Sequence, residues 1–149
     1  VRLPADNPTP EPKEIDKIIK HHLLKNPNGF SSNLCEINES GYPDGIGAEV
    51  FNTFLLSQLF KGKRKCISLE HIHMNFIDYE KSEAIDKNWC SISTLKCPEI
   101  YARPDLILDV NTIDQYYFMK NLYEALYPIS NKFTIEDIIK WHDNKKSKP

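Results

Sequence analysis

Two aspartates follow short apolar stretches and stand just before segments with helical periodicity. Asp6 comes after "VRLPA", and Asp109 ends "LILD". In open α/β sheets ligands bind outside the carboxyl ends of strands, and two carboxylates there could hold a hard divalent cation such as Mg²⁺ against a phosphate. Aspartate is also common in such loops for structural reasons, because it caps helices and bonds its own backbone. The spacing of the two residues leaves both interpretations open.

A second candidate is the loop "GYPDGIGAEVF" at residues 41–51. Three glycines and a proline predict a tight loop, whose backbone N–H groups can meet the oxygens of a ligand. The loop is not a P-loop, because no G-K-[ST] follows, and it does not match G-x-G-x-x-G. An ordinary turn between two strands explains the same composition.

The third candidate is "LEHIHMNF" at residues 69–76. A histidine near an acid could transfer protons, although more histidines serve as surface or hydrogen-bonded residues. His71 and His73 are two positions apart, so on a helix they would point in different directions. That geometry is poor for joint metal ligation.

The elements that must position these residues follow from hydrophobic periodicity. Strands are expected at the start of the chain and at four later places, and the segment 97–105 is expected to be extended because of its prolines. "LILDV" at 106–110 is typical of a buried strand. Helices are expected at 13–25, after Phe51, and at 67–79, 111–127 and 133–143; the later strands are expected at 30–37, 48–51, 89–95 and 106–110. Alternating helices and strands predict an α/β fold with helices over a mainly parallel or mixed sheet.

Composition excludes several classes of protein. The 149 residues make one domain, 1–149, and the net charge of −2 provides no basic field for nucleic acid. No apolar run is long enough to span a bilayer, so we expect no membrane partner. The four cysteines form no C-x-x-C pair, which does not support a zinc site and favours reduced thiols in a cytoplasmic protein.

Four blocks of the chain resemble the cytidylyltransferases of the spore-coat polysaccharide type, relatives of CMP-sugar synthetases such as CMP-KDO synthetase. "VRLPADNPTPEPKEIDKII" is similar to the pattern R-x-T-G-D-x-P-x-x-x-P-x-x-I-D, and "GYPDGIGAEVF" to Y-P-D-G-x-x-x-E-V-F. "LEHIHMNFI" is similar to E-H-V-T-P-Y-I, and "RPDLILDVNTIDQYYFMKNLYEAL" to R-L-T-V-D-T-x-E-D-L-x-x-x-x-x-I-Y-E-x-L. Order and spacing agree over nearly the whole chain.

The resemblance implies a GT-A-like α/β fold and transfer of CMP from CTP to a sugar acid or related sugar, with release of pyrophosphate. It implies that Asp6 and Asp109 bind Mg²⁺ and act in catalysis. The remaining residues that the resemblance assigns to the substrate are Arg2, Tyr42, Pro43, Asp44, Gly45, Glu49, Glu70 and His71.

The family's basic Gly/Ser loop, A-R-x-x-S-x-R-x-x-x-K, does not occur in these 149 residues. The chain therefore resembles the C-terminal part of such an enzyme, with the N-terminal part missing, and we expect weak CTP binding by this chain alone. Two alternatives stay open. The chain could be a non-catalytic module that binds a nucleotide sugar, or a dimerising half in which residues 95–106 pair with a second copy.

Overall fold

The computed structural model describes residues 1–33, 40–78 and 80–146. A small mixed sheet forms its centre, with strand order β2-β1-β5. Strand β1 (Phe30–Ser32) pairs antiparallel with β2 (Glu49–Phe51) and parallel with β5 (Ile92–Thr94). Arg2 continues the sheet beyond β2 through a bridge to Glu49. The predicted α/β class is confirmed, with a sheet of the mixed kind.

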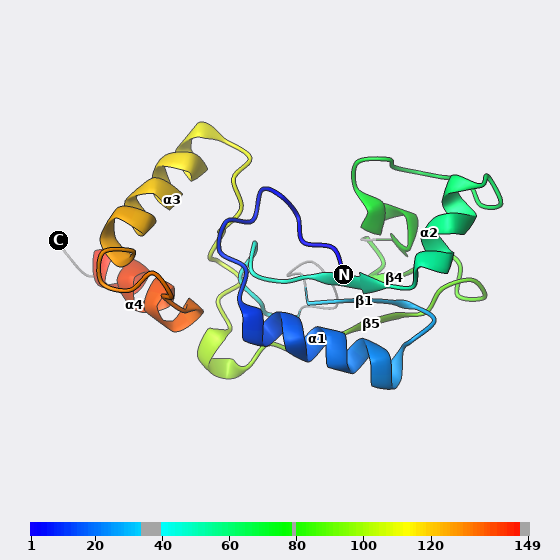
Figure 1. Ribbon diagram of the computed structural model, residues 1–149, viewed down its shortest axis with the longest axis horizontal. Coiled ribbons are helices and arrows are strands. Elements are labelled where there is room, and N and C mark those ends of the chain that lie inside the picture. Colours follow the sequence, from blue (N-terminus) through cyan, green and yellow to red (C-terminus); the bar gives the residue numbers. More distant parts are fainter. Residues whose placement is uncertain (34–39, 79, 147–149) are drawn as a thin grey trace.

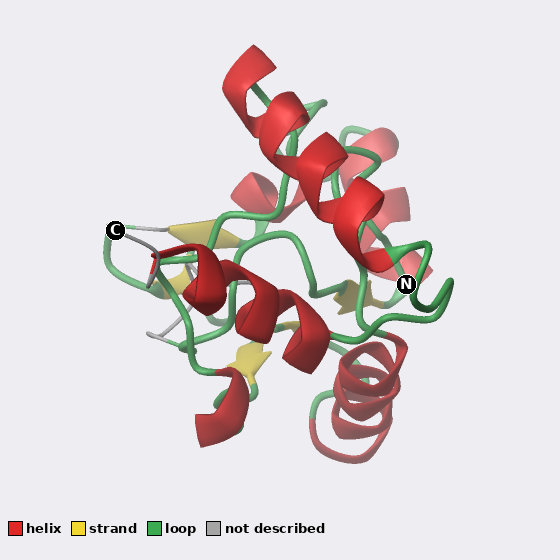
Figure 2. Cartoon of the chain, turned by 90° about the vertical axis from the view of Figure 1, so that its left-hand side faces the viewer, coloured by secondary structure: helices red, strands yellow, loops and turns green. Residues whose placement is uncertain are grey.

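The helices cover the sheet and both of its ends (Figure 1). Helix α1 (Pro12–Lys25) lies along the sheet, and α2 (Thr53–Phe60) lies at one end. Helices α3 (Ile113–Leu126) and α4 (Ile135–Lys146) lie together at the other end. Figure 2 shows how helix and loop surround the short strands. None of the described helices has the length and apolar character that crossing a membrane requires.

Local signals explain where three helices begin. The Glu11 side chain accepts from Lys13 N at the start of α1. Thr112 and Gln115 form a capping box at the start of α3. Thr134 donates to the Asp137 carboxylate ahead of α4, as the spacing of these two residues predicts. Each contact satisfies a backbone donor that has no partner within its helix.

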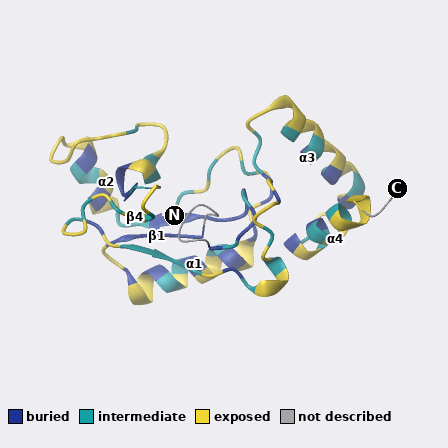
Figure 3. Cartoon of the chain, turned by 180° about the vertical axis from the view of Figure 1, so that it is seen from behind, coloured by how far each residue is buried: buried dark blue, intermediate teal, exposed yellow. Residues whose placement is uncertain are grey.

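Buried residues gather along the strands and on the inner faces of the helices (Figure 3). Ile18 of α1 packs against Ala48 and Val50. At the α2 end, Phe30 and Phe76 stack with ring centroids 5.2 Å apart. The first contacts pack α1 against β2 and the residue before it, and the second packs β1 against Phe76.

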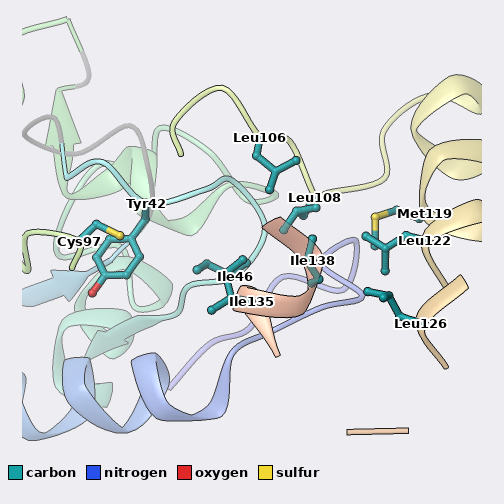
Figure 4. Packing of buried hydrophobic residues seen from close by; sticks show 10 residues of the cluster. All are labelled: Tyr42, Ile46, Cys97, Leu106, Leu108, Met119, Leu122, Leu126, Ile135 and Ile138. Atoms are coloured by element: carbon teal, nitrogen blue, oxygen red, sulfur yellow. The ribbon is translucent and has the colours of Figure 1, made fainter. Parts of the chain in front are cut away.

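A further core joins α3 and α4 to two loop segments (Figure 4). Leu106 and Leu108 face the helices from one segment, and Tyr42 and Ile46 come from the other. The helices contribute Met119, Leu122, Leu126, Ile135 and Ile138. Since both segments carry predicted site residues, this core decides where those residues lie.

Two predicted elements are wrong. Residues 67–78, the described part of the helix expected at 67–79, do not form an α-helix: a short 3-10 helix, η1 (Ile72–Asn75), precedes β3 (Ile77–Asp78), which pairs with β4 (Glu83–Ala84). Residues 106–110 form no strand of the sheet: Ile107 bridges Asp44 and is 49% exposed, although Leu106 and Leu108 beside it are buried.

Other predictions hold in part. Residues 95–106 contain the 3-10 helix η2 (Glu99–Tyr101) rather than a fully extended run. Strand β1 ends at Ser32, and residues 34–37 of the predicted strand lie outside the described part of the chain. Ile113, the first residue of α3, is exposed despite its apolar side chain. Helix α3 is buried further along, where Met119 and Leu122 meet α4 and the loops.

Candidate functional site

A cleft of about 710 Å³ opens where the start of the chain, the 44–49 loop, the 70–74 loop and the 109–111 segment meet. Seven of the residues that the resemblance assigns to a site line it. They are Arg2, Asp6, Asp44, Glu49, Glu70, His71 and Asp109. Further lining residues are Pro4, Ala5, Asn7, His73, Met74 and Asn111. Residues near the start of the chain thus share one cavity with residues about 100 positions later.

Backbone hydrogen bonds bring the aspartates of this cleft together. Val110 N donates to Asp6 O at 2.9 Å, which places Asp6 beside the residue that follows Asp109. Asp44 also pairs with this segment: its N–H donates to Leu106 O and its carbonyl accepts from Leu108 N, each at 3.0 Å. The segment that carries Asp109 is therefore hydrogen-bonded to both Asp6 and Asp44.

Gly45 makes the second of these pairings sterically feasible. Its φ of +88° lies in the left-handed region that favours glycine. A Cβ at this position would stand 2.6 Å from Leu108 C and 2.7 Å from Asp109 N. The "PDG" turn therefore approaches the Asp109 segment as closely as its backbone allows.

The electrostatic surroundings of Asp109 favour a bound cation. Burial, followed by the charges of Asp44 and Asp6, raises the pKa of the Asp109 carboxyl above its usual range. A backbone hydrogen bond and the amide of Asn111, whose Nδ2 donates to Oδ2, oppose this rise in pKa. Gln115 Nε2 also donates to Oδ1, at 3.2 Å. The side chain is thus held in place while its charge is incompletely compensated.

Glu49 supplies a fourth carboxylate, and it is entirely buried. Its side chain is 0% exposed, and Oε1 lies 2.7 Å from both Arg2 Nη1 and His73 Nδ1. Arg2 is tied to Glu49 by its backbone as well, through Arg2 N to Glu49 O at 2.8 Å and Glu49 N to Arg2 O at 3.0 Å. Arg2, the one arginine among the described residues that line the cleft, is therefore already paired with an acid.

Asn75 shapes the loop that brings Glu70, His71 and His73 to the cleft. Its Oδ1 accepts from Ile67 N and Ser68 N, and its Nδ2 donates to Ser68 O and Ile72 O. These bonds satisfy backbone groups that an α-helix would otherwise pair. The loop replaces the predicted helix for this reason, and both histidines consequently line the same cleft, with ring centroids 5.5 Å apart.

Three of the predicted site residues do not line the cleft. Tyr42 is buried in the core, where its hydroxyl donates to Glu14 Oε2 at 2.7 Å; burial and that hydrogen bond raise its pKa. Pro43 and Gly45 are buried as well. These residues shape the loop from behind instead of contacting a ligand in the cleft.

The cleft offers carboxylate oxygens, which are the kind of ligand that Mg²⁺ prefers. Within residues 1–33, 40–78 and 80–146, no group of three or more His, Cys, Asp or Glu side chains is arranged to hold a metal. Mg²⁺ does not require such a group, since it usually binds one or two carboxylates and completes its octahedron with water and substrate phosphates. Asp6 and Asp109 could supply those carboxylates, and Asp44 adds negative charge beside them.

Sequence reasoning missed His73 and the two amides that hold Asp109. The sequence shows a histidine two positions after His71, but on the expected helix its side chain would point in a different direction from that of His71.

Comparison with known proteins adds no assignment. The chain matches no protein-family model, and no curated protein or solved structure matches it.

Proposed function

We propose that this chain is part of a nucleotidyltransferase that transfers CMP from CTP to a sugar acid or related sugar with Mg²⁺. The observation that carries the proposal is the convergence of Asp6 and Asp109, 103 positions apart in the sequence, on one acidic cleft, where the charge of Asp6 acts on Asp109. The order of the elements and the four sequence blocks support a GT-A-like fold. CTP and the sugar are then the partners, in the cytoplasm where CTP is made available for surface polysaccharide synthesis.

The charges of the cleft explain why a cation is part of the proposal. Five described lining residues carry carboxylates, whereas Arg2 is the one lysine or arginine among them. A triphosphate would be repelled by this surface. Bound Mg²⁺ would neutralise phosphate charge and orient the α-phosphorus for attack by the sugar hydroxyl.

The residues of the chain have separate tasks in this proposal. Asp6 and Asp109 hold the cation, and the amides of Asn111 and Gln115 orient the Asp109 carboxylate toward it. Glu70 and His71, on the opposite loop, face the sugar. The buried residues Tyr42, Pro43 and Gly45 set the distance between the two sides of the cleft.

A pyrophosphate-release assay tests this function. The intact protein is incubated with CTP, Mg²⁺ and a panel of sugar acids and related sugars. Because a metal contributes several kcal/mol to stabilising the transition state, Asp6→Asn and Asp109→Asn should each lower the rate by about 10²-fold or more. Asp16→Asn is the matched control, since Asp16 is exposed on α1 outside the cleft.

Two results would count against transfer of CMP. One is equal activity of wild type and both cleft variants. The other is a wild type that releases no pyrophosphate with any sugar. In the second case, binding of a nucleotide sugar by the same cleft would favour the non-catalytic module, and light scattering that shows a homodimer without ligand binding would favour the dimerising half.

A further inference from the structure

The pair formed by Glu49 and His73 is not needed to bind a cation or to complete the sheet. The backbone of Arg2 already joins the first residues to β2, and the Arg2 guanidinium already pairs with Glu49. His73 nevertheless approaches Glu49 Oε1 to 2.7 Å from a different loop. No described residue provides a hydrogen-bond partner for Oε2 of this buried carboxylate. The interaction of Glu49 with its surroundings is therefore concentrated on Oε1, where the imidazole is bound.

The chemistry of a carboxylate determines which proton lies in this contact. An ionised carboxylate only accepts hydrogen bonds, so Nδ1 of His73 carries the hydrogen and donates it. In the neutral ring Nε2 is then the basic nitrogen. A buried acid that orients a histidine through one ring nitrogen is the arrangement that prepares the other nitrogen to accept a proton.

The position of His73 puts this base within the acidic cleft. Its side chain is 19% exposed and lines the same cavity as Asp6 and Asp109. Glu49, by contrast, is 0% exposed and cannot meet a ligand directly through solvent. Both members of the pair line the cavity, but of the two only His73 has a partly exposed side chain.

We propose that His73, oriented by Glu49, is the general base that deprotonates the acceptor hydroxyl; this inference rests on the proposed transfer of CMP. The acceptor oxygen forms a bond to the α-phosphorus of CTP, and its proton passes to Nε2 of His73. The bond between the α-phosphorus and the bridging oxygen breaks, and its electron pair leaves with pyrophosphate. The proton on His73 then passes to solvent, which restores the neutral ring. In this assignment Glu49 is a positioning residue and His73 a catalytic one.

The test measures CMP transfer by the intact protein as a function of pH. His73→Gln removes the base but retains a side chain that can donate to Glu49. General-base catalysis contributes about 10²- to 10⁴-fold, so kcat should fall by at least about 10²-fold, with a much smaller change in KM for the sugar. The loss of rate toward acidic pH that protonation of His73 causes should disappear in the variant. Other titratable and charged groups line the same cleft and could add a pH dependence of their own to the rate. They are Glu49, Arg2, Glu70, His71, Asp6, Asp44 and Asp109.

Two companion variants separate catalysis from structure. His21→Gln makes the same chemical change on α1, where His21 Nε2 contacts Ser93 Oγ outside the cleft, and should retain the wild-type rate. His73→Gly should regain activity when imidazole is added, which a purely structural histidine would not allow. Thermal unfolding of each variant establishes that it is folded at the assay temperature.

The outcomes distinguish this inference from the proposed function. An active wild type with a His73→Gln variant of similar kcat, or a variant that keeps the acidic limb, overturns the role of His73 and leaves CMP transfer in place. A wild type that transfers no CMP overturns both. Lower kcat, a missing acidic limb and rescue by imidazole together support the general base.

Discussion

Replacing Gly45 with alanine should disturb the cleft from behind, without touching a charged group. The residue adopts a φ of +88°, and an added Cβ would approach Leu108 C to 2.6 Å and Asp109 N to 2.7 Å. Both contacts are with backbone, so no flexible side chain can move away to make room. Either the "PDG" turn or the segment that carries Asp109 must shift.

The magnitude follows from two separate effects. Forcing an L-residue into the left-handed region costs about 1–2 kcal/mol. Crowding a closely packed site costs about 1–3 kcal/mol more. Gly45→Ala should therefore lower the free energy of unfolding by about 2–5 kcal/mol, a large part of the stability of an ordinary domain.

Gly62→Ala provides a matched control for the first effect. Gly62 has a φ of +67°, yet a Cβ there would meet nothing within 4 Å. The change in the unfolded chain is the same in both variants, so it cancels in the comparison. Urea unfolding of the two variants should place Gly45→Ala below Gly62→Ala by about 1–3 kcal/mol.

The functional consequence should follow the steric one. At a temperature where Gly45→Ala is still folded, the displaced Asp109 should weaken Mg²⁺-dependent pyrophosphate release, while Gly62→Ala should not. Equal destabilisation by both substitutions would refute the reasoning, because it would mean that the close approach of the turn to the Asp109 segment imposes no constraint. If Gly45→Ala is destabilised but releases pyrophosphate at an unchanged rate, the position of the turn does not influence the site.

Three further predictions concern the charges and amides. Because the pKa of Asp109 is raised in the folded protein, its ionised form opposes folding at neutral pH, and this penalty disappears as pH falls through the raised pKa. The free energy of unfolding of Asp109→Asn minus that of wild type should therefore increase with pH across the acidic range. A difference that decreases with pH would show that the pKa is lowered instead. Gln115→Leu removes the amide that donates to Asp109 and the side-chain acceptor of the α3 capping box. We expect urea unfolding to show a loss of about 0.5–2 kcal/mol, and pyrophosphate release to be slower by about 10- to 100-fold. An unchanged rate would exclude a positioning role for Gln115. Tyr42→Phe leaves Oε2 of buried Glu14 without the hydroxyl that donates to it at 2.7 Å, so the free energy of unfolding in urea should fall by about 1–3 kcal/mol. A much smaller loss would mean that the tyrosine hydroxyl does not make this hydrogen bond.

Much of the secondary structure could be predicted because its signals are local. Pro12 at the first position of α1 and the Thr112–Gln115 box of α3 depend on residues within one helical turn of each other. The same reasoning failed at residues 67–79, where the spacing of Ile72 and Phe76 suits a helix. There Asn75 bonds four backbone groups and stabilises a loop instead, a competition that periodicity does not reveal.

For the candidate site, the sequence by itself determined which carboxylates stand at the ends of apolar segments, since strand-end context and the four sequence blocks both indicate Asp6 and Asp109. Only the tertiary structure decided what surrounds them. Residues 106–110 pair with the "PDG" turn instead of the sheet, which brings Asp44 next to Asp109, and the loop around Asn75 directs His73 onto buried Glu49. Contacts between residues 24 or more positions apart depend on how the chain packs as a whole, and for that reason no local pattern could have shown them.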